Sequence, residues 1–209
     1  IVLCHSKTGR IDEQGVLVGT YDHKMRIDLT KPHERFGDLI SIMYNPCWPI
    51  FGVVRSSIFK MTPLHGDYKG ADGNLLAEIG LYGRIYEVPE YLFFRRDHSQ
   101  AYTQRYVHSE HVNYRELMAW WASDSWINFT VWKNCCEFFR SVRRVPLKWS
   151  ERMLCYEQIF KWFMREGWRL MGKDVEFYFL SRSSLGRKLA SVVKMILRRT
   201  VIPIIEKER

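Results

Sequence analysis

The distribution of tryptophan and proline changes near residue 110, and this change limits the fold more than any other feature of the chain. Seven of the eight tryptophans follow this point, whereas proline is nearly absent there. Long helical patterns cover residues 112–122, 128–143, 150–171 and 185–202, because apolar side chains recur every three or four residues. We therefore predict an α/β half, residues 1–110, followed by a mostly helical carboxy-terminal region, residues 111–209.

The first half alternates between short strands and short helices. Runs of β-branched and aromatic residues predict strands, and hydroxyl caps, an early proline and helical spacing predict helices. The predicted strands are 1–6, 16–20, 49–57, 84–88 and 91–96, the last two joined by Pro89-Glu90, and the predicted helices are 30–43, 56–62 and 73–82.

The composition is typical of a globular chain, and its net positive charge indicates an anionic partner. Apolar residues make up 46% and charged residues 26%, and no apolar run is long enough to span a membrane. The five cysteines include no C-x-x-C pair, which favours a reducing, cytoplasmic setting. The net charge is +9, and residues 181–209, with eight Lys or Arg and two Glu, contribute +6 of it.

The stretch GADGNLLAEIGLYGRIYEVPEYLFFRRDH, residues 70–98, contains the most distinctive pattern. Asp72 stands between small residues at the start of a helix, where backbone N–H groups and the helix dipole favour an ionised carboxylate. Such a carboxylate can act as a general base toward a hydroxyl group. The alternative is that Asp72 simply caps the helix.

This stretch, together with the preceding NPCWPIFGVVRSSIFKMTPLHGDYKG, resembles the acceptor-side half of family-two glycosyltransferases, inverting enzymes of GT-A fold. The resemblance covers roughly residues 1–105 and lies in the order of its parts: a small residue and Asp, a helix, a glycine turn, Val-Pro-Glu, an aromatic strand and a basic end. Many relatives have Glu before this Asp, whereas this chain has Ala71. The resemblance implies a partial GT-A (Rossmann-like) mixed sheet.

The resemblance also implies a reaction and its residues. A sugar passes from a nucleotide-sugar donor to a hydroxyl of a glycan or lipid-linked acceptor, with Asp72 as the general base. The small residues Gly70, Ala71 and Gly73 leave room for substrate beside it. From its place in a loop between two prolines, Trp48 is expected to line the acceptor site.

The same resemblance implies that the basic residues at the end of the stretch bind the diphosphate of the donor. Arg95 and Arg96 lie near the diphosphate, and His98 lies beside them as the candidate ligand of a divalent metal, Mg²⁺ or Mn²⁺. The alternative is a solvated strand end in which Asp97 pairs with an arginine.

Two other patterns have structural alternatives. His108 and His111 are three residues apart, but no third metal ligand is close in the sequence. The tryptophans of the second half can stack on sugar rings, although helical spacing is more typical of core positions.

The parts of a GT-A enzyme that hold the nucleotide are missing from this sequence. It contains no Asp-x-Asp and no glycine-rich loop after a strand, and it opens on Ile1-Val2-Leu3 within a predicted strand. We therefore expect a fragment that lacks the amino-terminal nucleotide-binding half and does not transfer sugar alone.

The last predicted helix, 185–202, has one apolar and one basic face. It can make a peripheral contact with the inner face of the membrane, where lipid-linked acceptors are found, or it can pack on the preceding helices. We expect no nucleic-acid partner. The alternative functions are a basic nucleic-acid-binding module, for which no recognisable motif is present, and a membrane-surface scaffold held by this helix.

Overall fold

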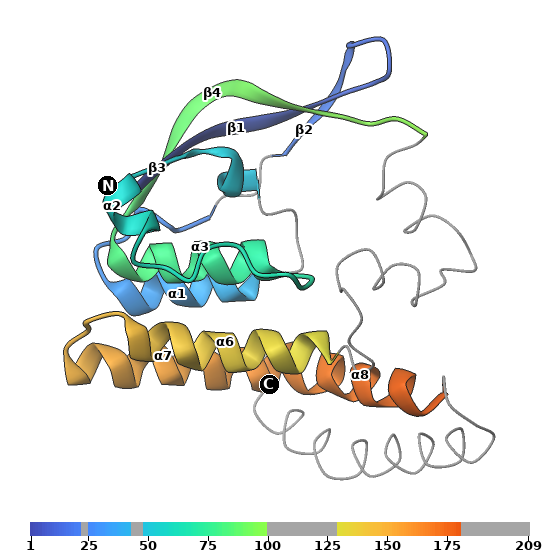
Figure 1. Ribbon diagram of the computed structural model, residues 1–209. Coiled ribbons are helices and arrows are strands. Elements are labelled where there is room, and N and C mark those ends of the chain that lie inside the picture. The colour runs from blue at the N-terminus through green and yellow to red at the C-terminus, as the bar shows by residue number, and fades with distance from the viewer. Residues whose placement is uncertain (22–24, 43–47, 100–128, 181–209) are drawn as a thin grey trace.

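The computed structural model describes residues 1–21, 25–42, 48–99 and 129–180. The fold is mixed α/β, as predicted, and Figure 1 shows it as a sheet, a pair of helices beneath the sheet, and a second pair of helices beneath the first. The predicted helices 112–122 and 185–202 lie outside the described residues. Within the described ranges, no helix combines the length and apolarity needed to cross a lipid bilayer.

The sheet is built around β1 (Leu3–Ile11). Along one edge, β1 pairs in parallel with β4 (Ile85–Arg96) over its whole length. Along the other edge it pairs antiparallel with β3 (Val53–Val54) near its start and with β2 (Leu17–Tyr21) near its end. Figure 1 shows the ends of β1, β2 and β4 extending beyond the helices.

One predicted strand boundary was wrong, because β4 is a single strand and not two strands joined by Pro89-Glu90. Ser6 pairs with Val88, but the next residue, Lys7, pairs with Tyr91. The two intervening residues therefore form a bulge on β4. A bulge accepts Pro89 because its nitrogen has no hydrogen to donate to the ladder.

The predicted buried strand 49–57 was also wrong. Residues Trp48–Phe51 form a 3₁₀ turn, η1, and only the two residues of β3 pair with the sheet. Val53 is 79% exposed, so this segment is an edge and not a core strand. A Cβ atom on Gly52 would lie 2.4 Å from the carbonyl oxygen of Cys4, so only glycine allows this close approach to β1. The predicted short helix is present as α2 (Ser56–Phe59).

The first helix pair consists of α1 (Pro32–Ser41) and α3 (Ala71–Tyr82). Proline at the first position of α1 starts the helix as predicted, but its cap is Lys31 and no side chain caps it. The α3 helix begins two residues earlier than predicted and ends before Gly83, as predicted.

The second helix pair consists of α6 (Thr130–Arg144) and α7 (Trp149–Trp162). The predicted helix 150–171 is in fact three elements, because a π-helical turn, η2 (Phe163–Gly167), separates α7 from α8 (Trp168–Leu180). A Cβ atom on Gly167 would lie 2.7 Å from the Trp162 ring, so the ring packs directly against the glycine backbone.

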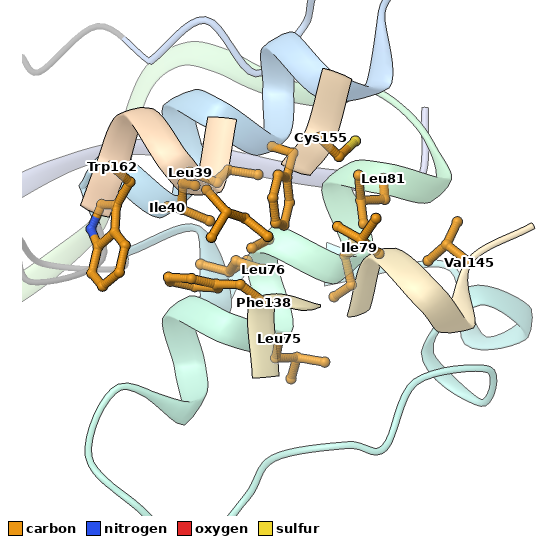
Figure 2. Close-up of a cluster of buried hydrophobic side chains, with 14 of the residues drawn as sticks. Leu39, Ile40, Leu75, Leu76, Ile79, Leu81, Phe138, Val145, Cys155 and Trp162 are labelled. Atoms are coloured by element: carbon orange, nitrogen blue, oxygen red, sulfur yellow. The ribbon is translucent and has the colours of Figure 1, made fainter. Parts of the chain in front are cut away.

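A single core cluster joins the two helix pairs, with residues on both sides of position 110. Phe138 of α6 is fully buried and meets the rings of Phe36 and Trp162 edge to face, at centroid distances of 6.2 and 5.2 Å. Figure 2 shows side chains of this cluster converging, among them Leu39 of α1, Leu76 of α3, Phe138 of α6 and Trp162 of α7. The core prediction for tryptophan holds for Trp162 and Trp168, whereas Trp132 and Trp149 are 46% and 71% exposed.

Candidate functional site

Asp72 lies in the first turn of α3 and is partly exposed. Its Oδ1 accepts a hydrogen bond from the backbone N–H of Gly73 at 2.9 Å. The cap residue of α3 is Gly70, so Asp72 is not the cap that the structural alternative supposed. An anion at this position is stabilised by the aligned N–H groups at the start of the helix.

Gly70 and Ala71 shape the entry to this turn. Gly70 has φ of 88°, a left-handed conformation that glycine adopts without strain, and its carbonyl accepts from the N–H of Asn74 at 3.0 Å. Ala71 is 2% exposed, so its methyl group faces the protein and not the solvent. Gly70 thus sets the direction of the chain before the carboxylate, and Ala71 anchors the helix start.

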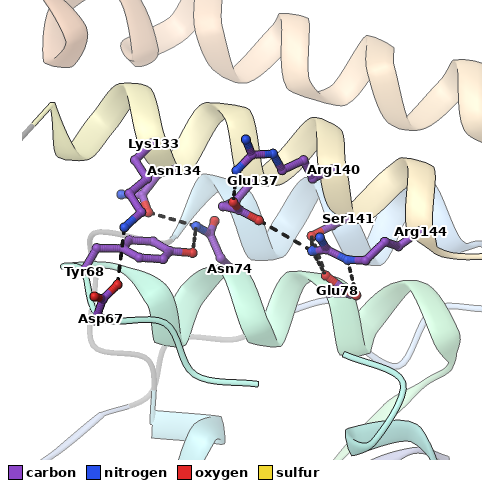
Figure 3. A network of polar contacts seen from close by, with 10 residues as sticks. All are labelled: Asp67, Tyr68, Asn74, Glu78, Lys133, Asn134, Glu137, Arg140, Ser141 and Arg144. Carbon is purple, nitrogen blue, oxygen red and sulfur yellow. Dashed lines mark hydrogen bonds and ion pairs between the residues drawn. The ribbon is translucent and has the colours of Figure 1, made fainter. Parts of the chain in front are cut away.

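Asparagines from two helices fix the segment that precedes Asp72. Asn74 Nδ2 donates to the hydroxyl of Tyr68 and to Oδ1 of Asn134, both at 2.9 Å. Asn134, fully buried on α6, in turn donates to the carbonyl oxygen of Lys69 at 3.2 Å. Figure 3 shows Tyr68, Asn74 and Asn134 between α3 and α6.

Neither asparagine was predicted as a site residue from the sequence. The sequence does contain one indication of Asn134, a polar residue on the apolar face of a helix. Asn134 follows the buried Val131 by three residues and precedes the buried Phe138 by four. Buried polar groups of this kind are usually hydrogen-bonded across an interface.

A second contact from α6 holds the same segment from outside. Lys133 Nζ lies 4.3 Å from the centre of the Tyr68 ring and 3.4 Å from Oδ1 of Asp67. The neighbouring Lys69 is partly buried, and this burial lowers its pKa from the ordinary value.

A narrow apolar gap lies beside the start of α3, and it has no room for a water molecule. Gly73, next to Asp72, and Pro49, next to Trp48, both line it, so the two predicted substrate-contacting regions adjoin. Its full lining is Met25, Leu39, Ile42, Pro49, Gly73 and Leu76. Within the described residues, this gap is a packing contact between α1, α3 and η1 and is too small to hold a sugar.

Trp48 is part of an aromatic cluster on the sheet. Its ring lies 5.1 Å from Tyr21 and 6.5 Å from Phe51, and Phe51 stacks on Phe93 at 4.9 Å. The guanidinium of Arg95 lies 5.5 Å from the centre of the Trp48 ring. The structure thus brings together Trp48 and Arg95, two residues that the sequence analysis proposed separately.

The basic end of β4 is tied to the β1–β2 hairpin. Arg95 Nη1 donates to the Tyr21 hydroxyl at 2.7 Å, and its Nη2 lies 3.4 Å from Asp97. Asp97 also accepts two hydrogen bonds from Arg10, at 2.9 and 2.6 Å. The pairing of Asp97 with arginine, which the structural alternative supposed, is therefore present.

Arg96 and His98 occupy different surroundings. Arg96 donates to the carbonyl oxygens of Asp12 and Glu13 in the hairpin turn, at 3.0 and 2.8 Å. His98 is partly buried at the end of the strand. Within the described residues, no hydrogen bond or ion pair links Asp72 with Arg96 or His98. His108 and His111 lie outside these residues.

The described residues do not fit a divalent-metal site. In residues 1–21, 25–42, 48–99 and 129–180, no group of three or more His, Cys, Asp or Glu side chains comes together as a metal cage. His98 alone supplies too few ligands for Mg²⁺ or Mn²⁺, which prefer several oxygen donors. Its role as a metal ligand stays a prediction.

Comparison with known proteins gives no match for this chain, whether with protein-family models, with curated proteins or with solved structures.

Proposed function

We propose that this chain is the acceptor-side part of an inverting glycosyltransferase of GT-A fold, with the helical region 111–209 appended to it. The enzyme would transfer a sugar from a nucleotide-sugar donor to a hydroxyl of a glycan or a lipid-linked acceptor. The single observation that supports this most is the pattern of residues 70–98, in which Asp72 stands partly exposed in the first turn of α3.

In the proposed reaction, Asp72 takes the proton of the acceptor hydroxyl. The hydroxyl oxygen forms a bond to the anomeric carbon on one side of the sugar, and the bond from that carbon to the diphosphate oxygen breaks on the other side. One displacement of this kind inverts the configuration. A carboxylate within hydrogen-bond reach of the acceptor is sufficient as a base.

Positive charge favours departure of the nucleoside diphosphate. We assign this role to Arg95 and Arg96 at the end of β4, with His98 beside them. A divalent metal belongs to the proposal for the longer enzyme, but none of the steps above depends on it. Trp48, with the cluster around it, provides flat apolar surface on which the acceptor sugar can stack.

The test is Asp72→Asn in a protein expressed from the whole reading frame that contains this chain. Nucleoside diphosphate release is measured with a panel of nucleotide sugars and acceptors. We expect turnover to fall by at least about 100-fold, the usual contribution of a general base, while donor affinity changes little. Glu90→Gln is the control, because Glu90 is an exposed acid in the bulge of β4 and not on the segment that precedes Asp72. Turnover above a tenth of the wild-type value would exclude Asp72 as the base.

A further inference from the structure

Helix α7 carries a second stripe of apolar residues beside its buried face, and the described chain leaves much of this stripe exposed. Cys155, Ile159 and Trp162 face the core and are buried. Beside this face, four residues at i, i+4, i+7 and i+11 form a stripe along the helix: Trp149, Met153, Tyr156 and Phe160. Tyr156 is half-buried and also packs against the core cluster. Trp149, Met153 and Phe160 are 71%, 47% and 62% exposed.

Helix α6 carries a stripe with the same spacing. Trp132, Cys136, Phe139 and Arg143 recur at i, i+4, i+7 and i+11, and residues so spaced lie on one side of a helix. Trp132 and Phe139 are 46% and 44% exposed.

The two stripes adjoin, because the rings of Phe139 and Tyr156 lie 5.7 Å apart. We call this joint outer surface of Trp132, Cys136, Phe139, Arg143, Trp149, Met153, Tyr156 and Phe160 the α6–α7 face. A helix that is apolar on its outer as well as its inner side normally has a second apolar partner or a membrane against it.

The charge around the α6–α7 face is positive. Residues 130–162 contain seven Lys or Arg and three Glu, a net charge of +4. Each of the three acids has a partner within the fold: Glu137 pairs with Arg140 and Arg144, Glu151 with His33, and Glu157 with Lys161.

Two cations at the turn between the helices lack such a partner. Arg143 and Lys148 are exposed, and within the described part of the chain neither forms an ion pair. Lys148 directly precedes Trp149, the most exposed tryptophan of those described. Uncompensated positive charge therefore lies at the edge of the aromatic surface.

We propose that the α6–α7 face binds the surface of an anionic lipid bilayer. Aromatic rings and methionine enter the boundary between headgroups and acyl chains, and Arg143 and Lys148 contact lipid phosphates. Aromatic side chains with basic residues at their edge are typical of helices that lie in this boundary, whereas acids without partners would oppose it. The proposal does not depend on the glycosyltransferase assignment.

The first test is cosedimentation of the full chain with vesicles. We expect binding to vesicles of 30% phosphatidylglycerol in phosphatidylcholine to be at least about tenfold stronger than to phosphatidylcholine alone. The triple variant Phe139→Gln/Trp149→Gln/Phe160→Gln should lose at least about tenfold of the binding to anionic vesicles.

The matched control removes three exposed apolar side chains from the sheet and its β1–β2 turn: Val16→Gln/Val53→Gln/Leu92→Gln. This control should bind as the wild type does. A second pair of variants tests the charge. Arg143→Gln/Lys148→Gln should weaken binding and reduce its salt dependence, whereas Lys60→Gln/Arg84→Gln, with the same change in net charge on exposed residues elsewhere, should have less effect.

Brominated lipids give a measurement on the folded wild-type protein. Bromine quenches only tryptophans at the lipid boundary, so quenching should fall clearly in Trp149→Phe. Equal quenching in the two proteins would overturn the proposal.

The proposal would also be overturned if the triple variant bound as the wild type does, since another segment such as 185–202 would then carry the contact. Binding to neither vesicle, or a lipid-free dimer that the triple variant abolishes, would overturn it as well.

Discussion

Replacing Arg144 by methionine tests how α6 is held on α3. Glu78 of α3 is 1% exposed and accepts a hydrogen bond from Ser141 Oγ at 2.7 Å and two from Arg144, at 3.1 and 2.6 Å. Figure 3 shows this group between the two helices. Arg144→Met leaves the Glu78 carboxylate buried with Ser141 as its remaining partner.

The expected cost follows from the burial of the two groups. Breaking a buried ion pair by removing one partner typically destabilises a protein by about 3–5 kcal/mol. The Arg144 side chain is 34% exposed, and Ser141 still donates to the carboxylate, so water and the hydroxyl compensate in part. We therefore expect a loss in the lower part of this range, about 3 kcal/mol in the free energy of unfolding.

Two further variants distinguish two causes of the lost stability: the buried, unpaired charge of Glu78 and the lost contacts of an arginine. In Glu78→Leu/Arg144→Met both charges are gone, and we expect a free energy of unfolding within about 1 kcal/mol of the wild-type value. Arg140→Met is the matched control on the same helix, because Arg140 pairs with Glu137 at an exposed position. It should leave the stability unchanged within error.

Urea unfolding followed by far-ultraviolet circular dichroism measures all four proteins. The reasoning is refuted if Arg144→Met and Arg140→Met have the same effect. It is also refuted if the double variant is less stable than Arg144→Met, since the buried charge would then not be the cause of the loss.

Two other predictions concern buried titrating groups. Burial lowers the pKa of His5 from 6.5, although a hydrogen bond to a carbonyl and the nearby Glu87 act in the opposite direction. The folded state thus favours the neutral ring, so stability is fully present above pH 6.5 and is lost as the pH falls through the lower folded pKa. The melting temperature of His5→Asn should accordingly fall less than that of the wild type between neutral and mildly acidic pH, and an equal fall would contradict this. Burial also raises the pKa of Cys135 to about 11 and of Cys155 to about 12, whereas Cys136 is exposed. Iodoacetamide at mildly alkaline pH, followed by peptide mapping, should label Cys136 in the native protein and label the other two only after denaturation.

Much of the helical structure could be predicted from the sequence. The ends of α1, α3 and α6 fall within a few residues of the predicted ones, because each helix has an apolar face that recurs with helical spacing. The π-helical turn after Trp162 was not predicted, although Glu166 and Gly167 interrupt the apolar spacing there.

The candidate site was predictable only in part. Asp72 and its small neighbours could be recognised because they are adjacent in the chain and begin a helix. The contact of Arg95 with Trp48 and the hydrogen bonds of Asn134 with Asn74 and the Lys69 carbonyl could not be found in this way, because the partners come from different elements.

The positions of the main helices and of their apolar residues follow from residues only a few positions apart. Only long-range packing specifies that β4 continues through Pro89 as one strand, that Glu78 lies against Arg144, 66 residues away, and that the stripes of α6 and α7 adjoin. The physical reason is that such pairings depend on which distant surfaces exclude water from each other most completely, and no local pattern of residues specifies that choice.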